Sequence, residues 1–215
     1  MGDAGRAGIA KYFQSALGLL EPPAWAVVYG RFQVSGLLSV ARAIDALNER
    51  FGRVVTWLAL IMVLIQFIVV VMRYVFGLSS LFMQESIVYM HAIVFLAAAG
   101  YTLLHDGHVR VDIFYGGATA RTRALVNLLG VLFLLLPMMV MTVLVSWGFV
   151  RASWAVLEVS QEGSGIPAVF LLKTFILVFA VVLFLQGISL AVHSLAVLRG
   201  IESTPTPEAE EEHAL

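Results

Sequence analysis

The sequence predicts an all-α membrane protein with four transmembrane helices, an amphipathic interfacial helix before them, and both termini in the cytoplasm. Three observations support this fold class. Of the 215 residues, 60% are hydrophobic and only 13% are charged, a balance outside the range of soluble domains. Four apolar runs are long enough to cross a bilayer core, which takes roughly 20 helical residues. Arginines gather beside one set of span ends.

The same composition excludes several classes of function. The formal net charge is -1 at pH 7, so no general basic surface points to a nucleic-acid partner. Cysteine is absent, which excludes disulfides, Cys-ligated zinc and iron–sulfur clusters. The ATP-binding pattern G-x-x-x-x-G-K-[ST] does not occur in the sequence. We therefore expect membrane lipid around the chain, no nucleic acid, and no cofactor bound by the chain itself.

The N-terminal part divides into two predicted segments. Residues 1–30 form a cytoplasmic extension, in which the prolines of "EPP" at 21–23 interrupt any helix. Residues 31–52 are predicted to form an amphipathic helix along the cytoplasmic membrane surface, with a solvated linker as the alternative. Its apolar stripe consists of Leu37, Leu38, Ala41, Ile44, Leu47 and Phe51. The charged Arg42, Asp45 and Glu49 are expected to point away from that stripe.

A four-helix transmembrane domain follows over residues 53–198. Its spans are predicted at about 54–75, 86–105, 124–150 and 167–197. Pro137 lies near the middle of the third run and predicts a kink or tilt there. Residues 199–215 are acidic and contain prolines, so we expect a disordered tail.

The distribution of positive charge predicts the orientation of the spans. Seven arginines lie next to one set of span ends: Arg42, Arg50, Arg53, Arg110, Arg121, Arg123 and Arg199. The other set has Arg73, Arg151 and Lys173. Because positive charge favours the cytoplasmic side, both termini and the loop between spans two and three are predicted to be cytoplasmic.

The loop sequence "HDGHVRVDIFYG", residues 105–116, concentrates histidines and aspartates. His105 and His108 are three residues apart, a spacing that suits metal ligands on one helix face. However, Gly107 is expected to end span two, which would separate the two histidines. No spacing fixes a third ligand, so we predict no metal site. The favoured interpretation is a cytoplasmic loop in which His108, Arg110 and Asp112 contact another subunit.

A haem site is the second possibility that the histidines raise. His105 and His193 are predicted at the same membrane face, so a single low-spin haem between them is an alternative that geometry leaves open. Catalytic and substrate-binding residues are not predicted anywhere in the chain.

Glu85 and Lys173 are opposite charges near the periplasmic ends of spans two and four. An intramembrane charge is costly enough to suggest a purpose. The two side chains either pair with each other or contact lipid and partner subunits, and the sequence leaves both options open. Three polar residues within the spans are predicted to form hydrogen bonds between helices: Gln66, Asn127 and Gln186.

Several of these stretches together resemble the small membrane subunit of tripartite ATP-independent periplasmic (TRAP) transporters. They are "LFMQE" at 81–85, "GHVRVD" at 107–112, "RTRA" at 121–124 and "GIPAVFLLKT" at 165–174. The resemblance covers about residues 42–198. "AIDALNERFGRVVTWLALIMVL" at 43–64 is similar to the branch with a longer N-terminus, often labelled for mannitol or chloroaromatic compounds.

One motif of that family is altered here. Members often have a Trp-x-Glu-Glu element before span two, and its last acid aligns with Glu85. Phe82 then stands at the tryptophan position and Gln84 at the first glutamate. Glu85 is therefore the acid that can perform the role of this element.

The resemblance implies a three-part complex in the bacterial inner membrane. A periplasmic solute-binding protein delivers an organic acid to a large membrane subunit, which moves it inward with sodium while the small subunit braces it. The chain is thus expected to be a non-enzymatic scaffold, with sodium required by the whole complex. A haem-carrying electron-transfer subunit and a self-associating small transporter remain alternatives. Four spans without a central charge cluster make a poor ion-coupled transporter alone.

Overall fold

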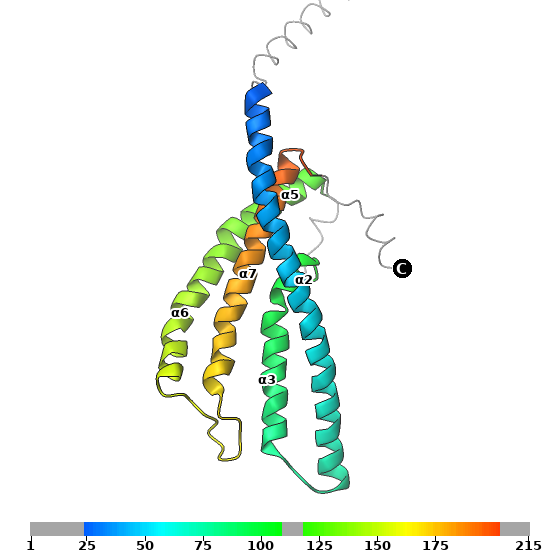
Figure 1. The fold of residues 1–215 in the computed structure, drawn as a ribbon, viewed down its shortest axis with the longest axis vertical. Coiled ribbons are helices and arrows are strands. Elements are labelled where there is room, and N and C mark those ends of the chain that lie inside the picture. The colour runs from blue at the N-terminus through cyan, green and yellow to red at the C-terminus, as the bar shows by residue number, and fades with distance from the viewer. Residues whose placement is uncertain (1–23, 109–117, 203–215) are drawn as a thin grey trace, which may run out of the picture. The chain divides into compact units, whose positions relative to one another are not determined.

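The computed structural model describes residues 24–108 and 118–202, and all regular secondary structure in these ranges is helical (Figure 1). The elements in chain order are α2 (Ala24–Val75), α3 (Leu81–Ala97), α4 (Ala99–Leu104), α5 (Ala120–Gly130), the π-helical turn η1 (Val131–Leu135), α6 (Leu136–Ala155) and α7 (Val169–Leu198). The chain divides into two compact units, residues 1–37 and residues 38–215, each defined by its internal contacts. The packing discussed below lies within the second unit.

Four helical stretches are long and apolar enough to cross a membrane, as the sequence predicts. They are Gly36–Val75, Leu81–Leu104, Ala120–Ala155 and Val169–Leu198. Few of their large apolar side chains are buried, and most of those in the first and third stretches are exposed, as expected for helices whose outer surface faces lipid or another membrane protein. The chain is therefore a multi-pass membrane protein.

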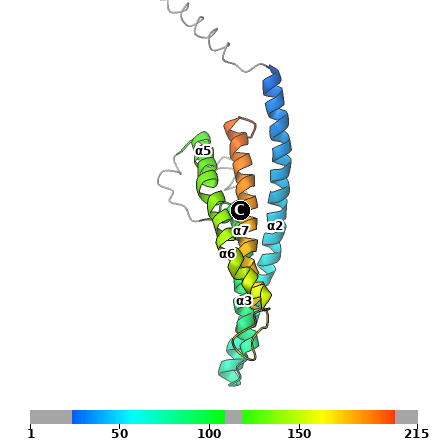
Figure 2. The ribbon, with the colours of Figure 1, turned by 90° about the vertical axis from the view of Figure 1, so that its left-hand side faces the viewer.

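Helix α7 is the central packing element. It contacts α3, α4, α5 and α6, and it forms hydrogen bonds to α2. Figure 2 shows α7 between α5 and α2. Its fully buried positions are mostly small residues, including Ala180, Ser189 and Ala196, each with none of its surface exposed. Small side chains let neighbouring backbones approach closely, which is how helices associate where lipid removes the usual hydrophobic drive.

The third span is interrupted next to Pro137, where the sequence predicts a kink or tilt. The π-helical turn η1 ends at Leu135, and Pro137 occupies the first turn of α6. Proline lacks an N–H and its ring crowds the carbonyl four residues earlier, so an α-helical ladder does not continue unchanged through it. The chain changes direction between α5 and α6 (Figure 1), which confirms the predicted break.

The second span begins earlier than predicted. Ser80 is the N-cap of α3, and its hydroxyl accepts a hydrogen bond from the Met83 N–H. Glu85 therefore lies one turn inside the helix and does not begin it. At the other end, Asp106 adopts a left-handed conformation with φ 54°, and the Gly107 N–H donates to the Thr102 carbonyl at 2.8 Å. This is a Schellman ending, so Asp106 makes the turn that we expected of Gly107.

The structure divides the apolar stripe predicted within residues 31–52 between two faces of α2. Helix α2 continues through residues 52 and 53 without a break. Leu38 and Ala41 are buried on the face that carries Asp45. The apolar Leu37, Leu47 and Phe51 are exposed, which is compatible with contact with a membrane surface. The position of this stretch along a membrane surface stays a prediction.

Candidate functional site

Polar side chains of the described helices gather in two clusters at opposite ends of the transmembrane unit. The first, the loop anchor, joins α3 to the connection between α6 and α7. The second, the Asp45 network, joins the middle of α2 to the C-terminal part of α7. Both are built from residues far apart in the sequence, so each of them holds the tertiary arrangement.

The loop anchor is centred on the Glu85 carboxylate. One oxygen accepts a hydrogen bond from the Ser160 hydroxyl at 2.5 Å. The other accepts one from the Ile166 backbone N–H, also at 2.5 Å. Hydrogen bonds to a charged acceptor are stronger than neutral ones. Glu85 therefore fixes both sides of the 156–168 connection on the end of α3.

A glycine makes this anchor possible. A Cβ added to Gly165 would lie 2.5 Å from one Glu85 carboxylate oxygen and 2.6 Å from the other. That approach is closer than a carbon atom and an oxygen atom tolerate, so only glycine fits beside the carboxylate. Gln84, which replaces the other acid of the family element, instead donates to the Ser79 hydroxyl at 3.1 Å.

Lys173 has a different partner from the one that the sequence suggested. Its ammonium donates to the Glu158 carboxylate at 2.5 Å, and it lies 4.0 Å from the centre of the Phe149 ring. The Lys173 side chain is 18% exposed and the Glu158 side chain is 36% exposed. The option of a Glu85–Lys173 pair is thus not realised, because each charge is satisfied by the connection between α6 and α7.

Glu158 reaches this position because α6 ends abruptly. Leu157 adopts a left-handed conformation with φ 45°, and the Glu158 N–H donates back to the Ser153 carbonyl at 3.0 Å. This Schellman ending turns the Glu158 side chain back beside α7. The hydrogen bond from Lys173 lowers the pKa of Glu158 below its ordinary value of 4.5. Glu158 is therefore a carboxylate at neutral pH.

The Asp45 network connects α2 to α7 through one carboxylate. Asp45 accepts hydrogen bonds from Gln186 at 2.9 Å, from Ser189 at 2.6 Å and from His193 at 3.0 Å. The Asn48 side-chain amide in turn donates a hydrogen bond to the side-chain oxygen of Gln186 at 2.6 Å. Asn48, Gln186 and Ser189 are buried. These contacts confirm that Gln186 forms hydrogen bonds between helices.

His193 lies between two carboxylates. Its Nε2 is 3.0 Å from Asp45 and its Nδ1 is 2.7 Å from Glu202. Both contacts are hydrogen bonds only when both ring nitrogens carry a proton, so the geometry fits the imidazolium form. Arg42 lies 3.8 Å from Glu202 and adds a second, more exposed cation.

The described histidines do not form the haem pair that the sequence left open. Both ring nitrogens of His193 face carboxylates, and Nε2 of His105 lies 2.7 Å from Glu49. Axial ligation of a haem iron by His193 would require it to give up one of its two carboxylate contacts. Within residues 24–108 and 118–202, no group of three His, Asp or Glu side chains is arranged to hold a metal ion.

The predicted subunit-contact loop is only partly described. His108 is exposed, whereas Arg110 and Asp112 lie outside the described residues. Their contact with another subunit stays a prediction. Of the other polar residues, Gln66 is exposed on α2 and does not form the predicted hydrogen bond between helices of this chain.

Sequence reasoning missed six members of the two clusters: Asp45, Asn48, Ser189, Glu202, Glu158 and Ser160. A signal for Asp45 was present, because Ala41, Asp45 and Asn48 recur at spacings of four and three residues, the pattern of a packed helix face. Comparable spacing signals do not exist for Glu158 and Ser160, which lie in a connection.

Comparison with protein families agrees with this architecture. The model described as "Tripartite ATP-independent periplasmic transporters, DctQ component" matches residues 62–199, which is more than half of the chain. No curated protein and no solved structure in the comparison matches the chain. The matched residues contain the second, third and fourth spans and the loop anchor. The chain therefore belongs to the DctQ family, the small permease component of TRAP transporters.

Proposed function

We propose that this chain is a structural subunit that braces the large membrane subunit of a TRAP transporter in the bacterial inner membrane. The complex takes up an organic acid delivered by a periplasmic solute-binding protein and couples uptake to sodium. The small subunit itself binds neither sodium nor the substrate. The N-terminal stretch 43–64, most of which precedes the matched residues, favours the branch labelled for mannitol or chloroaromatic compounds.

The observation that carries the proposal is where the charged groups of the described helices lie. Lys173, Glu85, Asp45 and His193 belong to the two clusters, which lie towards opposite ends of the transmembrane unit, and each is engaged by another group of this chain. A sodium-coupled carrier needs oxygen ligands and substrate contacts near the middle of the membrane. A chain whose described charges stabilise its own helix packing is suited to scaffolding.

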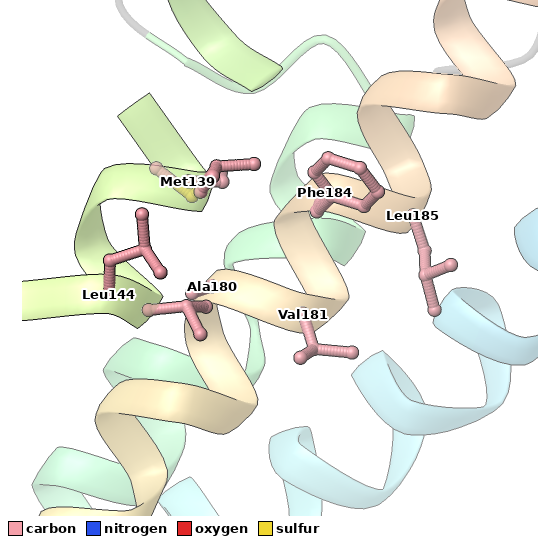
Figure 3. A pocket seen from close by; sticks show the side chains of 8 residues that line it. Met139, Leu144, Ala180, Val181, Phe184 and Leu185 are labelled. Carbon is pink, nitrogen blue, oxygen red and sulfur yellow. The ribbon is translucent and has the colours of Figure 1, made fainter. Parts of the chain in front are cut away.

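The groove between α6 and α7 supports the same interpretation. This groove has a volume of about 230 Å³ and is lined by Met139, Val140, Val143, Leu144, Ala180, Val181, Phe184 and Leu185. Figure 3 shows the lining side chains. All eight side chains are apolar. A carboxylate placed there would lose its hydration without gaining a hydrogen bond or a cation, so this groove does not suit an organic acid.

The predicted orientation gives the two clusters distinct surroundings. The seven arginines of the sequence analysis belong to the same set of span ends as the Asp45 network, which we assign to the cytoplasm. The loop anchor then faces the periplasm, from which the binding protein approaches. The anchored 156–168 connection is the part of this chain suited to border that approach.

Co-purification tests the bracing role through the 105–123 loop. Changing Arg110→Ala and Asp112→Ala together should reduce recovery of the large subunit with the tagged small subunit, while membrane insertion is unchanged. Arg151→Ala is the matched control, because this exposed arginine lies at the opposite span ends. Unchanged recovery and uptake in the double variant would remove the loop from the interface.

A further inference from the structure

One face of α2 begins as a packed surface and continues as an exposed one. Positions on this face recur at alternating spacings of three and four residues, the pattern of a helix seam. Its packed half consists of Leu38, Ala41, Asp45, Asn48, Gly52 and Val55. The next positions in the same register are Ala59, Met62, Gln66 and Val69. We call these four residues the open half of the α2 seam.

Burial falls along the seam although the register is unbroken. Ala41 is 1% exposed, Asn48 3% and Val55 6%. Ala59, Met62 and Val69 are only partly buried, and Gln66 is exposed. The same helix face therefore packs closely against this chain over its first half and is only partly covered by the described residues over its second.

Gln66 shows that lipid is not the natural cover of the open half. Between Trp57 and Arg73 it is the single residue with a hydrogen-bonding side chain. Seven residues separate it from Arg73, which places it about 10 Å from that end of the helix. Its short side chain does not reach headgroups across that distance, and an amide without a partner in hydrocarbon is costly. Among the described residues no hydrogen bond to the Gln66 side-chain amide is formed.

The opposite face of α2 shows what a lipid-facing surface of this helix looks like. Leu64 is 54% exposed and Ile68 is 45% exposed, and both are apolar. Leu64 lies two residues from both Met62 and Gln66, which places it about 200° around the helix from each. The one polar side chain of this stretch therefore lies on the face that continues a packed seam, and not on the apolar face.

We propose that the open half of the α2 seam binds a transmembrane helix of the large subunit. This inference rests on the proposed function, because it names the membrane partner that the bracing role requires. The partner helix carries a hydrogen-bonding side chain opposite Gln66, where it satisfies the amide. Partly buried Ala59 and Met62 provide a small and an adaptable contact beside it.

Photo-cross-linking in the assembled complex tests this placement. A photoreactive amino acid at Met62 should capture the large subunit, and the same group at Leu64, on the opposite face, should not. Capture of a second copy of this chain, capture of lipid alone, or equal capture of the large subunit from Leu64 would overturn the proposal.

Substitution of Gln66 gives a second readout that does not depend on the cross-linker. Gln66→Leu keeps a side chain of similar size, and it should lower recovery of the large subunit about fivefold or more, the effect of losing one hydrogen bond between helices. Leu64→Ala should leave recovery unchanged. Unchanged recovery of the large subunit with the Gln66→Leu variant would contradict the proposal that the open half of the α2 seam binds it.

The two proposals fail in different ways. A complex that assembles and takes up substrate, but is captured from Leu64 and not from Met62, contradicts the seam alone. A chain that never recovers a large subunit contradicts the proposed function and the seam with it.

Discussion

At the residue scale, Asp45 is the side chain on which most contacts between α2 and α7 depend. Three donors converge on its carboxylate, from Gln186, Ser189 and His193. A buried donor that loses its acceptor destabilises the folded state, because its lost hydration is no longer compensated by a hydrogen bond. Asp45 therefore contributes more to the stability of the folded state than a charged residue on a surface helix would.

Asp45→Ala should lower the free energy of unfolding by about 1–3 kcal/mol, because it strands several donors at once. Arg42→Ala is the matched control on the same helix. The Arg42 side chain is 69% exposed and lies 3.8 Å from Glu202, so its loss should cost less than about 1 kcal/mol. Unfolding titrations of the purified chain in detergent measure both. Equal effects of the two substitutions would contradict the network.

The pKa of Glu158 gives a pH dependence with a definite sign. The hydrogen bond from Lys173 lowers this pKa below 4.5. A group with a lowered pKa stabilises the folded state fully above its unfolded pKa, and this stabilisation is lost as the pH falls through the folded pKa. The difference in thermal midpoint between the natural chain and Glu158→Gln should thus be constant near neutral pH and disappear below pH 4.5. A difference that grows in acid would contradict the Lys173–Glu158 contact.

The sequence could place Glu85 and Lys173 near one membrane face but could not pair them. Hydropathy gives the depth of a residue along a span. It does not give the path of a connecting segment, and here the 156–168 connection supplies a nearer partner for each charge. Glu158 and Ser160 belong to that segment, whose course depends on the Schellman ending at Leu157.

At the element scale, the spans were predictable because each is a long apolar run. The observed ends of the spans differ from the predicted ends by a few residues, because local capping at Ser80 and Asp106 determines where the helices begin and end. The inward face of α2 was not predictable from apolarity. In this helix the packed face carries Asp45 and Asn48, and the apolar Leu47 and Phe51 lie outside.

Close approach of α4 to its neighbours depends on Gly100. A Cβ added there would lie 2.5 Å from Val182 and 2.6 Å from the Asn48 amide oxygen. Gly100→Ala should therefore lower the thermal midpoint of the chain by several degrees, since α2 or α7 must move apart from α4. Gly148→Ala is the control, because a Cβ there meets nothing within 4 Å and alanine favours the helix. A neutral Gly100→Ala would contradict this packing.

At the scale of the whole molecule, the four spans and the arginine distribution predict one orientation. Reporter fusions after Arg123 and at the C-terminus should behave as cytoplasmic, and a fusion at Gln161 as periplasmic. Gln161 belongs to the anchored connection, so its side also fixes the side of the loop anchor. A periplasmic signal after Arg123 would reverse the assignment of both clusters.

Among the described residues, the charged groups of the two clusters bind one another and their neighbours in this chain, and apolar surfaces, with Gln66 among them, are left for contact with the surroundings. This division suits a subunit that positions another membrane protein. It does not suit a carrier, which must bind its ions and substrate between its own helices and release them on both sides.

Uptake by reconstituted liposomes tests this central claim most directly. Liposomes that contain the small subunit alone should show no sodium-dependent uptake of organic acid when the binding protein and substrate are added outside. Liposomes that contain both membrane subunits should show uptake under the same gradient. Sodium-dependent uptake by the small subunit alone would contradict the scaffold account.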